Sequence, residues 1–250
     1  LSPMTTFAVS LLSGGLDSTT VTTFAKQQVS EITALTFQYG QSHSKEVRSA
    51  QQISSILGIE HKLMDISFLR EIAWYSALTN PGLFPIPSDR SESVMGISIP
   101  ITYVPLRNTI FVSLAAGLLE SNVLNAIEVE NIPPEQIHAK LYMAPNAIDY
   151  SGYPDCRPEF FEQLSVTLQL GSKLGVEYGI SIEIETPIIE MSKAEIVNLA
   201  TELGAPLGQT WSCYEALELP CGRCDSCILR AKGFADAGLP DPLLSKLGAS

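Results

Sequence analysis

Short apolar runs and longer amphipathic stretches alternate along the first quarter of this chain. Runs rich in β-branched residues predict strands at residues 6–12, 32–38 and 61–66. The stretches between them repeat apolar positions with helical spacing and predict helices at residues 18–29 and 44–57. Strands that alternate with helices favour a parallel sheet with crossover helices. The predicted fold class is therefore α/β, with a Rossmann-like, doubly wound and mostly parallel sheet.

The remainder of the chain continues this pattern after an interruption. Further strands are predicted at residues 138–144 and 181–185. Further helices are predicted at residues 109–120, 159–174 and 193–203. These elements extend the alternation nearly to the C-terminus and favour the same single sheet.

The boundaries of these elements carry their own signals. Ser192 precedes the last helix and Glu195 stands three residues later, which is the pattern of a capping box. Residues 80–104 are rich in Pro, Gly and Ser and are interpreted as an irregular flap. Without repeats or a clear linker, residues 1–250 are expected to form one domain. Residues 205–250, which end in a Pro- and Gly-rich tail, are expected to be a metal-braced C-terminal extension.

Composition and charge narrow the class of function. Of the 250 residues, 45% are hydrophobic and 17% are charged, as in an ordinary globular protein. The longest apolar stretch, at residues 110–119, is too short to span a bilayer, and the N-terminal apolar run is interpreted as a strand and not as a secretory segment. We therefore expect a cytoplasmic protein without a membrane partner. With 15 basic and 27 acidic residues, the net charge of −12 disfavours direct nucleic-acid binding and favours a small-molecule enzyme.

Four of the five cysteines lie close together near the C-terminus, in the pattern C-x7-C-x2-C-x2-C. Two-residue gaps let neighbouring thiolates reach one ion, and four soft ligands satisfy a tetrahedral Zn²⁺. A full set of protein ligands leaves no open position, so the pattern predicts one structural zinc ion per chain. Two disulfides, or four buried thiols, are the alternatives. The predicted ligands are Cys213, Cys221, Cys224 and Cys227.

The first predicted strand runs directly into a Gly-rich turn, SGGLDS, which opens a helix. Backbone N–H groups at such a turn can approach an anion, and the helix N-terminus attracts it. The turn lacks both the Gly-Lys-Ser/Thr ending of a Walker A loop and the Gly-x-Gly-x-x-Gly of dinucleotide folds. It resembles the pyrophosphate-binding loop of N-type ATP pyrophosphatases, which implies ATP with Mg²⁺ as the bound cofactor. The residues that we assign to ATP on this resemblance are Leu12, Ser13, Gly14, Gly15, Leu16, Asp17, Ser18, Thr19, Thr20, Val21 and Thr22.

Three charged side chains are candidates for the chemistry. Asp17, in the loop, is the predicted partner of Mg²⁺, a hard cation that prefers oxygen ligands. Arg107 opens an apolar helix, where its guanidinium can hold a phosphate or a carboxylate in a bidentate manner. Lys193 follows a strand end and stands near a helix N-terminus, where a nearby anion would explain a cation. The plainer interpretation of Arg107 and Lys193 is that each is a solvated surface residue.

A dense loop at residues 146–160, NAIDYSGYPDCRPEF, combines aromatic and charged side chains. This composition suggests a pocket for a flat polar ring. The substrate-binding candidates are Asp149, Tyr150, Tyr153, Asp155, Arg157 and Glu159. Cys156 in the same loop lacks a visible base beside it, because the three histidines stand at positions 43, 61 and 138. We interpret Cys156 as a packing or substrate-shape residue.

Taken in order, six motifs resemble the 7-cyano-7-deazaguanine synthase family: SGGLDS, YGQSHS, VPLRN, NAIDYSGYPDCRPEF, TP…SK and WSCY…CGRCDSC. The resemblance covers the chain from about residue 7 to residue 231 and implies a sheet like that of the adenine nucleotide alpha hydrolases. It implies that 7-carboxy-7-deazaguanine, ammonia and ATP are the substrates. The implied product is the nitrile, formed through adenylated acid and amide intermediates in queuosine- or archaeosine-type nucleoside biosynthesis. A homodimer is also implied.

Two other classes of function remain as alternatives. One is another ATP pyrophosphatase, such as a tRNA sulfur-insertion enzyme or an amide ligase. The net charge of −12 and the clustering of four cysteines oppose sulfur transfer to tRNA. The other is a zinc-stabilised nucleotide-binding or interaction module without catalysis, which leaves the dense loop at residues 146–160 unexplained.

Overall fold

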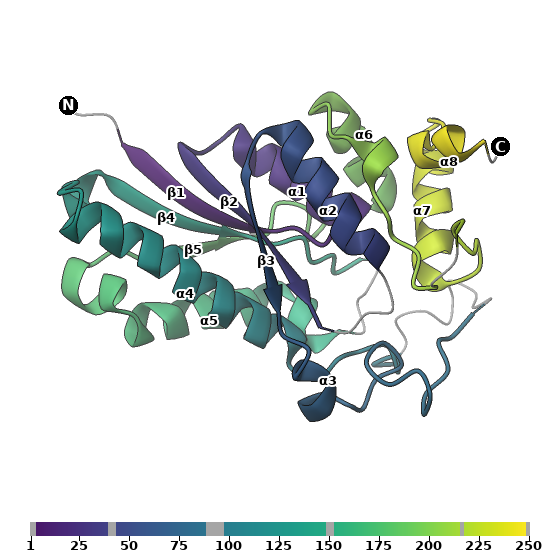
Figure 1. Ribbon diagram of the computed structural model, residues 1–250, viewed down its shortest axis with the longest axis horizontal. Coiled ribbons are helices and arrows are strands. Elements are labelled where there is room, and N and C mark those ends of the chain that lie inside the picture. Colours follow the sequence, from purple (N-terminus) through teal and green to yellow (C-terminus); the bar gives the residue numbers. More distant parts are fainter. Residues whose placement is uncertain (1–3, 40–43, 89–97, 149–152, 216–217, 249–250) are drawn as a thin grey trace.

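Five parallel strands form a sheet in the order β3-β2-β1-β4-β5 in the computed structural model, which describes residues 4–39, 44–88, 98–148, 153–215 and 218–248 (Figure 1). All four strand pairings are parallel. The predicted strands are confirmed to within two residues at each end. The strands are β1 (Thr5–Leu11), β2 (Glu31–Gln38), β3 (Glu60–Asp65), β4 (Ile137–Tyr142) and β5 (Ile182–Glu185).

The helices follow the predicted order, with corrections towards the C-terminus. Ser192 and Glu195 form the predicted capping box. The Pro- and Gly-rich tail contains a short helix, α8, which Asp241 caps by accepting from the N–H of Leu243. The predicted helix at residues 159–174 ends at Gly171, and a π-helical turn, Leu174–Tyr178, follows it. The helices are α1 (Leu16–Lys26), α2 (Ser44–Leu57), α3 (Leu69–Ile72), α4 (Arg107–Glu128), α5 (Pro158–Gly171), α6 (Lys193–Glu202), α7 (Asp225–Asp236) and α8 (Pro242–Leu247).

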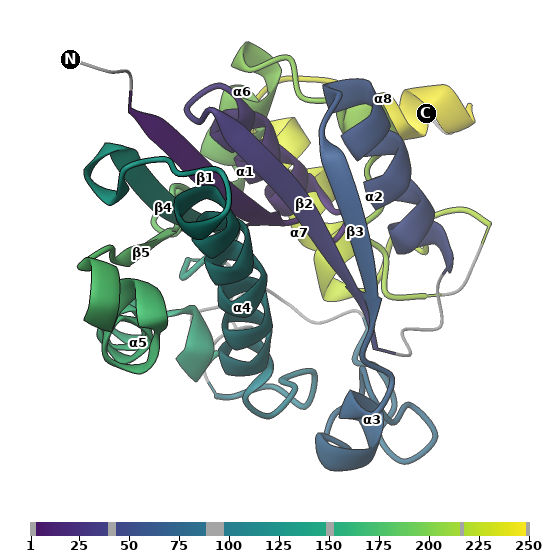
Figure 2. The same ribbon diagram turned by 60° about the vertical axis from the view of Figure 1, so that its left-hand side comes forward.

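Helices cover both faces of the sheet, as Figure 2 shows from the side. Successive residues of β1 point to opposite faces. Val9 packs in the core beneath α4 and α5 together with Leu119, whereas Ala8 packs in the core beneath α1 and α6 together with Val21. The predicted doubly wound α/β fold is therefore confirmed.

Helix α4 corrects the premise that the longest apolar stretch is too short to span a bilayer. It spans 22 residues, not the predicted 12, and its length and composition alone would allow it to cross a membrane. One face of the helix packs in the core, where Val112, Leu119 and Val123 are fully buried. These buried contacts with the sheet explain why the helix is apolar.

The order of the strands places a switch point between β1 and β4. The chain builds β1, β2 and β3 in one direction and then crosses back through α4 to β4 on the other side of β1. The loops that follow β1 and β4 therefore diverge at the carboxyl edge of the sheet, where α/β proteins bind ligands. The C-terminal extension reaches this edge because α7 packs against α6.

Candidate active site

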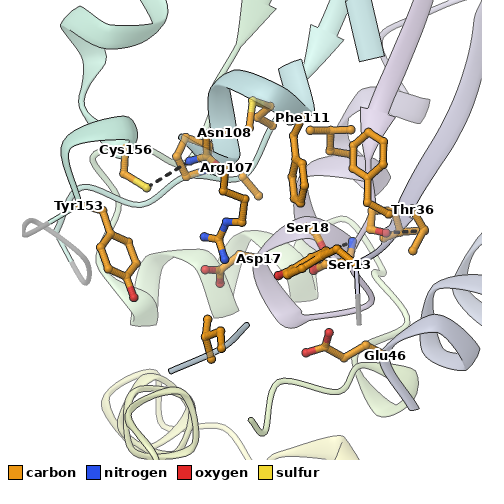
Figure 3. Close-up of a pocket in the computed structure, with 18 of the residues that line it drawn as sticks. Ser13, Asp17, Ser18, Thr36, Glu46, Arg107, Asn108, Phe111, Tyr153 and Cys156 are labelled. Atoms are coloured by element: carbon orange, nitrogen blue, oxygen red, sulfur yellow. Dashed lines mark hydrogen bonds between the residues drawn. The ribbon is translucent and has the colours of Figure 1, made fainter. Parts of the chain in front are cut away.

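Two adjoining cavities open at the carboxyl edge of the sheet, over the switch point. The larger cavity has a volume of about 290 Å³ and is lined by the ends of β1, β2 and β4 and by the N-terminus of α4 (Figure 3). The smaller cavity, of about 190 Å³, lies over the start of α1 and against α7. Residues shared by the two linings show that the cavities are continuous: Ser13, Asp17, Ser18, Glu46, Ala144 and Tyr214.

The Gly-rich turn forms the floor between the two cavities. Gly14 has a φ of +89° and packs so closely on α2 that a Cβ there would collide with the backbone oxygen of Glu46. The hydroxyls of Ser13 and Ser18 lie 3.0 Å apart and brace the turn from within. Gly15 precedes α1 without a side-chain cap. The first turn of α1 therefore offers N–H groups to an anion in the smaller cavity.

Lys193 and Asp17 meet beside this turn although they are 176 residues apart in sequence. The Nζ atom of Lys193 lies 2.8 Å from each carboxylate oxygen of Asp17. Both side chains are mostly buried, with 10% of Lys193 and 21% of Asp17 exposed. Lys193 is the first residue of α6, which the capping box fixes in place. The structure thus brings together two of the three predicted catalytic residues.

Arg107, the third predicted catalytic residue, lies in the larger cavity. Its helix begins abruptly after Leu106, which has a φ of +54°. Asp155 stabilises this helix start, because one carboxylate oxygen accepts from the N–H of Asn108 at 3.1 Å. Burial by itself would lower the pKa of the Arg107 guanidinium. Electrostatic interactions with its neighbours, of which that with Tyr39 is the largest, outweigh this effect, and the net pKa is raised. Arg107 therefore presents a permanent positive charge to the cavity.

Aromatic rings form one wall of the larger cavity. Phe111 of α4 lies 4.6 Å from Phe37 and 5.5 Å from Tyr39, measured between ring centroids. Tyr153 lines another part of the cavity, and its hydroxyl lies 2.7 Å from the hydroxyl of Thr102. Flat aromatic surfaces beside a guanidinium suit a planar, polar ligand.

The other predicted substrate residues occupy different positions. Asp155 is buried at the start of α4 and lines neither cavity; its second carboxylate oxygen has no hydrogen-bond partner among the described residues. Arg157 and Glu159 are exposed outside both cavities. Asp149 and Tyr150 lie outside the described residues. Of the four candidates that the structure describes, only Tyr153 lines a cavity.

The predicted nucleotide contacts divide along α1. Leu12, Ser13, Asp17 and Ser18 line the larger cavity, and Gly15 and Leu16 join the lining of the smaller one. The side chains of residues 19–22, which also belong to α1, are buried inside the protein and line neither cavity. The hydroxyl of Thr22, for example, lies 2.8 Å from that of Ser10 in the core. Four consecutive helical positions point around the whole helix, so these side chains are all buried because the sheet, α2 and α6 pack against different sides of α1.

Cys156 lines the larger cavity as a buried thiol. Its Sγ atom lies 3.5 Å from the side-chain nitrogen of Asn108. Burial, with a smaller contribution from Asp155, raises the pKa of the Cys156 thiol to about 12. A thiol that stays protonated at neutral pH is a poor nucleophile, which supports the interpretation of Cys156 as a packing or substrate-shape residue.

Several residues of the site were not anticipated from the sequence. Glu46 lines both cavities, and Arg230 of α7 lines the smaller one. The N–H of Trp211 donates to the carbonyl of Gly14 at 2.8 Å, so the segment before the cysteine cluster is bonded to the Gly-rich turn. Arg230 is held by Asp241 through bonds of 2.6 and 2.9 Å. No local sequence pattern marks these contacts, because each joins segments that are distant in the chain.

The four clustered cysteines form a site that can hold one metal ion. Their Sγ atoms all lie within 4.8 Å of one another, and those of Cys221 and Cys227 are 3.9 Å apart. Four ligands about 2.3 Å from a tetrahedral zinc ion would be separated by about 3.8 Å, so this arrangement fits. Backbone N–H groups point at the sulfurs, including that of Cys221, which lies 3.3 Å from the Sγ atom of Cys213. The disulfide alternative is wrong, because all five cysteines are free.

Comparison with known proteins places the chain in a family. The model of the family described as "Queuosine biosynthesis protein QueC" matches residues 7–238. The chain belongs to the QueC family. A relative from Thermoplasma acidophilum, named 7-cyano-7-deazaguanine synthase, is 43% identical over 94% of this chain and 90% of its own. Another of the same name, from Trichodesmium erythraeum, is 44% identical over 95% of this chain and 99% of its own.

Solved structures resemble this member of the QueC family more distantly. A predicted subunit of tRNA methyltransferase from Methanocaldococcus jannaschii is 15% identical over 80% of this chain and 75% of its own, with a TM-score of 0.46. The NH3-dependent NAD synthetase from Campylobacter jejuni is 18% identical over 82% of this chain and 66% of its own, with a TM-score of 0.35.

The packing of α7 on α6 makes a first prediction, at Gly233. A Cβ at this position would lie 3.0 Å from the Cβ atom of Lys193 and would collide with its Cγ atom. We therefore expect Gly233→Ala to lower the free energy of unfolding by about 1–3 kcal/mol through overpacking. Urea unfolding measures this change. Lys193→Ala removes the colliding Cγ atom but also the ion pair with Asp17, so the clash is isolated by comparing the two backgrounds: Gly233→Ala should cost much less stability in Lys193→Ala protein than in the wild type.

Gly117 provides the matched control for this substitution. It also lies inside a helix, α4, but a Cβ there would meet nothing within 4 Å. Gly117→Ala should therefore stabilise the protein by about 0.5–1 kcal/mol, as expected for a helical glycine. Equal effects of the two substitutions would contradict the view that Lys193 fills the space at Gly233.

Proposed function

We propose that the protein converts 7-carboxy-7-deazaguanine and ammonia to 7-cyano-7-deazaguanine at the expense of ATP, as a carbon–nitrogen ligase. The observation that carries this proposal is the continuity of the two cavities across the Gly-rich turn. The smaller cavity offers N–H groups, Lys193 and Arg230 to phosphates, and the larger one offers aromatic walls and Arg107 to a planar acid. An acid and a nucleotide can therefore meet over Ser13 and Asp17. The names of the relatives support the same assignment.

Leaving-group chemistry explains why ATP is needed. A carboxylate resists ammonia because it is an anion and would have to expel oxide. Transfer of AMP to one carboxylate oxygen converts that oxygen into a good leaving group, and ammonia then gives the amide. A second adenylation takes place on the amide oxygen; nitrogen then loses its two protons, the C–O bond to AMP breaks with its electron pair, and the nitrile forms. We therefore propose that two equivalents of ATP are cleaved between the α and β phosphates.

The residues of the smaller cavity suit the phosphate end of ATP. In the first turn of α1, N–H groups and the helix dipole favour the pyrophosphate that departs. We propose that Lys193 and Arg230 share its negative charge. Asp17 would hold Mg²⁺, a hard cation that carboxylate oxygens bind. Because Asp17 is paired with Lys193 in this structure, we propose that the arrival of Mg²⁺ and ATP redistributes this pair.

The residues of the larger cavity suit the acid. We propose that the guanidinium of Arg107 meets the carboxylate of 7-carboxy-7-deazaguanine and holds it towards the α-phosphate. Tyr153 and Phe111 would contact the faces of the deazaguanine ring. We keep Asp149 and Tyr150 as candidates for reading the ring's polar edge, and Asp155, Arg157 and Glu159 as weaker ones.

A direct assay tests the reaction. Protein incubated with 7-carboxy-7-deazaguanine, ammonium and Mg·ATP should yield first the mass of the amide and then that of the nitrile, with AMP and pyrophosphate released. Mass spectrometry and nucleotide chromatography measure these products. ADP and phosphate in place of AMP would overturn the adenylation step, and the absence of both organic products would overturn the proposed function.

The same assay tests the role of Lys193. Removal of one preorganised charge at the departing pyrophosphate should lower the turnover of Lys193→Met by about 10²-fold or more. Lys246 provides the control, because it lies on α8 outside both cavities, where its Nζ atom bonds to Gln209. Lys246→Met should keep full turnover. A Lys193→Met variant that is folded and fully active would exclude the assigned role.

We propose that the cysteine cluster holds one Zn²⁺ per chain in a structural role. Four sulfur ligands suit zinc and leave no position for substrate. The segment that follows Trp211 leads into this cluster, and Ser88 of the irregular flap forms an isolated β-bridge with Cys224. The ion would therefore fix both the extension and part of the flap over the cavities.

Metal removal tests the structural role. Zinc bound by four cysteines can supply on the order of 10 kcal/mol of binding free energy that is coupled to folding. Stripping the metal should therefore lower the melting temperature and should abolish turnover together with it. Elemental analysis, circular dichroism and the product assay measure these effects. Metal-free protein that keeps both its melting temperature and its turnover would contradict the proposal.

Cell location and partners are proposed on general grounds. Five free thiols suit the reducing cytoplasm. We propose that the protein acts there as a homodimer on small molecules, with no direct contact to nucleic acid, and that its product enters the biosynthesis of a queuosine- or archaeosine-type nucleoside.

A further inference from the structure

Glu46 occupies the junction of the two cavities. It lies in the first turn of α2, and its carboxylate points into the cavity in Figure 3. It contributes to the lining of both cavities, as Asp17 does. Among the described residues that line them, Asp17 and Glu46 are the only carboxylates. Any step in this site that needs a carboxylate of the protein must therefore draw on this pair, or on residues outside the described ranges.

The two carboxylates differ in their partners. Asp17 binds Lys193 through both oxygens. Glu46 has no ion pair or side-chain hydrogen bond with any described residue. A half-buried carboxylate without a partner is costly unless a ligand supplies one. A bound cation or a proton would therefore stabilise the Glu46 carboxylate.

The charges that surround Glu46 come from several elements. Burial, moderated by Arg107 and reinforced by Cys213, raises the pKa of the Glu46 carboxyl to about 7. A carboxyl with this pKa can both give up and accept a proton near neutral pH. The other titratable or charged side chains that line the shared cavities are Asp17, Tyr39, Tyr153, Cys156, Lys193, Tyr214 and Arg230.

The proposed reaction requires a proton acceptor, and Asp17, the other carboxylate of the lining, is bound by Lys193 and assigned to Mg²⁺. Ammonia is present in neutral water mainly as ammonium, which has no free electron pair and cannot attack a carbon atom. Lys193, Arg107 and Arg230 are cations and hold anions, and the Cys156 thiol is protonated. One carboxylate beside the reacting group would both attract ammonium and remove a proton from it.

We propose that Glu46 is a catalytic residue that binds the ammonium ion and removes its proton. This inference rests on the proposed function. One N–H bond of ammonium breaks, and its proton passes to a carboxylate oxygen of Glu46. The electron pair left on nitrogen forms the new C–N bond to the activated carboxyl carbon, and the C–O bond to the phosphate of AMP breaks with its electron pair. Nitrogen loses a second proton to water, and the Glu46 carboxyl returns its own proton to water through the open side of the cavity.

Two half-reactions separate this role from ATP binding. Exchange between ATP and labelled pyrophosphate, dependent on 7-carboxy-7-deazaguanine, reports adenylation without ammonia. Glu46→Gln should keep this exchange within about 10-fold of the wild-type rate, whereas its kcat/KM for ammonium should fall by about 10²- to 10⁴-fold. Loss of the exchange would overturn the proposal, because Glu46 would then serve ATP or Mg²⁺ instead.

Hydroxylamine sharpens the test. Its conjugate acid is far more acidic than ammonium, so most hydroxylamine is already a free nucleophile at neutral pH. Glu46→Gln should therefore form the hydroxamate at nearly the wild-type rate, although it forms the amide poorly. Equal losses with ammonium and hydroxylamine would overturn the role as a base.

Glu162→Gln is the matched control. Glu162 is exposed on α5 and lines neither cavity, so this variant should match the wild type with both nucleophiles. Wild-type protein without any substrate-dependent exchange would reject the proposed function itself. Wild-type exchange, with a Glu46→Gln variant that uses ammonium normally, would reject only the inference.

Stability provides a readout that does not depend on turnover. A carboxyl whose pKa rises from 4.5 in the unfolded chain to about 7 in the folded one makes folding less favourable as pH rises through this window. Glutamine does not titrate. The difference in melting temperature, Glu46→Gln minus wild type, should therefore increase as the pH rises from about 4.5 to about 7. A difference that stays constant over this range would show that Glu46 is not perturbed by the site.

Discussion

The ion pair between Lys193 and Asp17 is the interaction on which the geometry of the site depends. It joins the first turn of α1, which follows the Gly-rich turn, to the first residue of α6. Two mostly buried charges stay close only if the elements that carry them are held in register. The capping box fixes α6 from one side, and the close approach of Gly233 on α7 fixes the Lys193 side chain from the other. The pair therefore transmits the packing of the C-terminal extension to the Gly-rich turn.

The extension supports the site through a second, independent route. The backbone of Trp211 bonds directly to Gly14, and the ammonium of Lys45 on α2 lies 4.5 Å from the centre of the Trp211 ring. The cysteine cluster follows Trp211 by two residues. A metal ion there would bind no substrate, yet it would hold the backbone that shapes the nucleotide turn. Metal binding and nucleotide binding are thus expected to be linked through folding, with no shared ligand.

The two cavities differ in the charges and side chains that line them, as the nucleotide and the acid substrate of a ligase require. The smaller one gathers cations and helix N–H groups over a turn of glycines and serines, and the larger one sets a guanidinium among aromatic rings. Glu46 lies at the boundary, where a phosphate, an acid and a nucleophile would have to meet. Complete burial would raise the pKa of such a carboxyl so far that it would stay protonated at neutral pH. Full exposure would leave its pKa too low for it to serve as an efficient base.

The sequence by itself determined the order of strands and helices along the chain, the Gly-rich turn after β1 and the four cysteines that can hold a metal ion. Hydrophobic period and short spacings are local, so residues such as Ser13 and Cys224 could be assigned without contacts. The sequence did not predict the full length of α4, because the buried face of this helix depends on the sheet beneath it. Only the tertiary structure decided that Asp155 caps α4, that Arg230 and Glu46 enter the cavities and that Arg157 does not. These placements depend on contacts between segments far apart in the chain, and such contacts leave no periodic or spacing signal in the sequence.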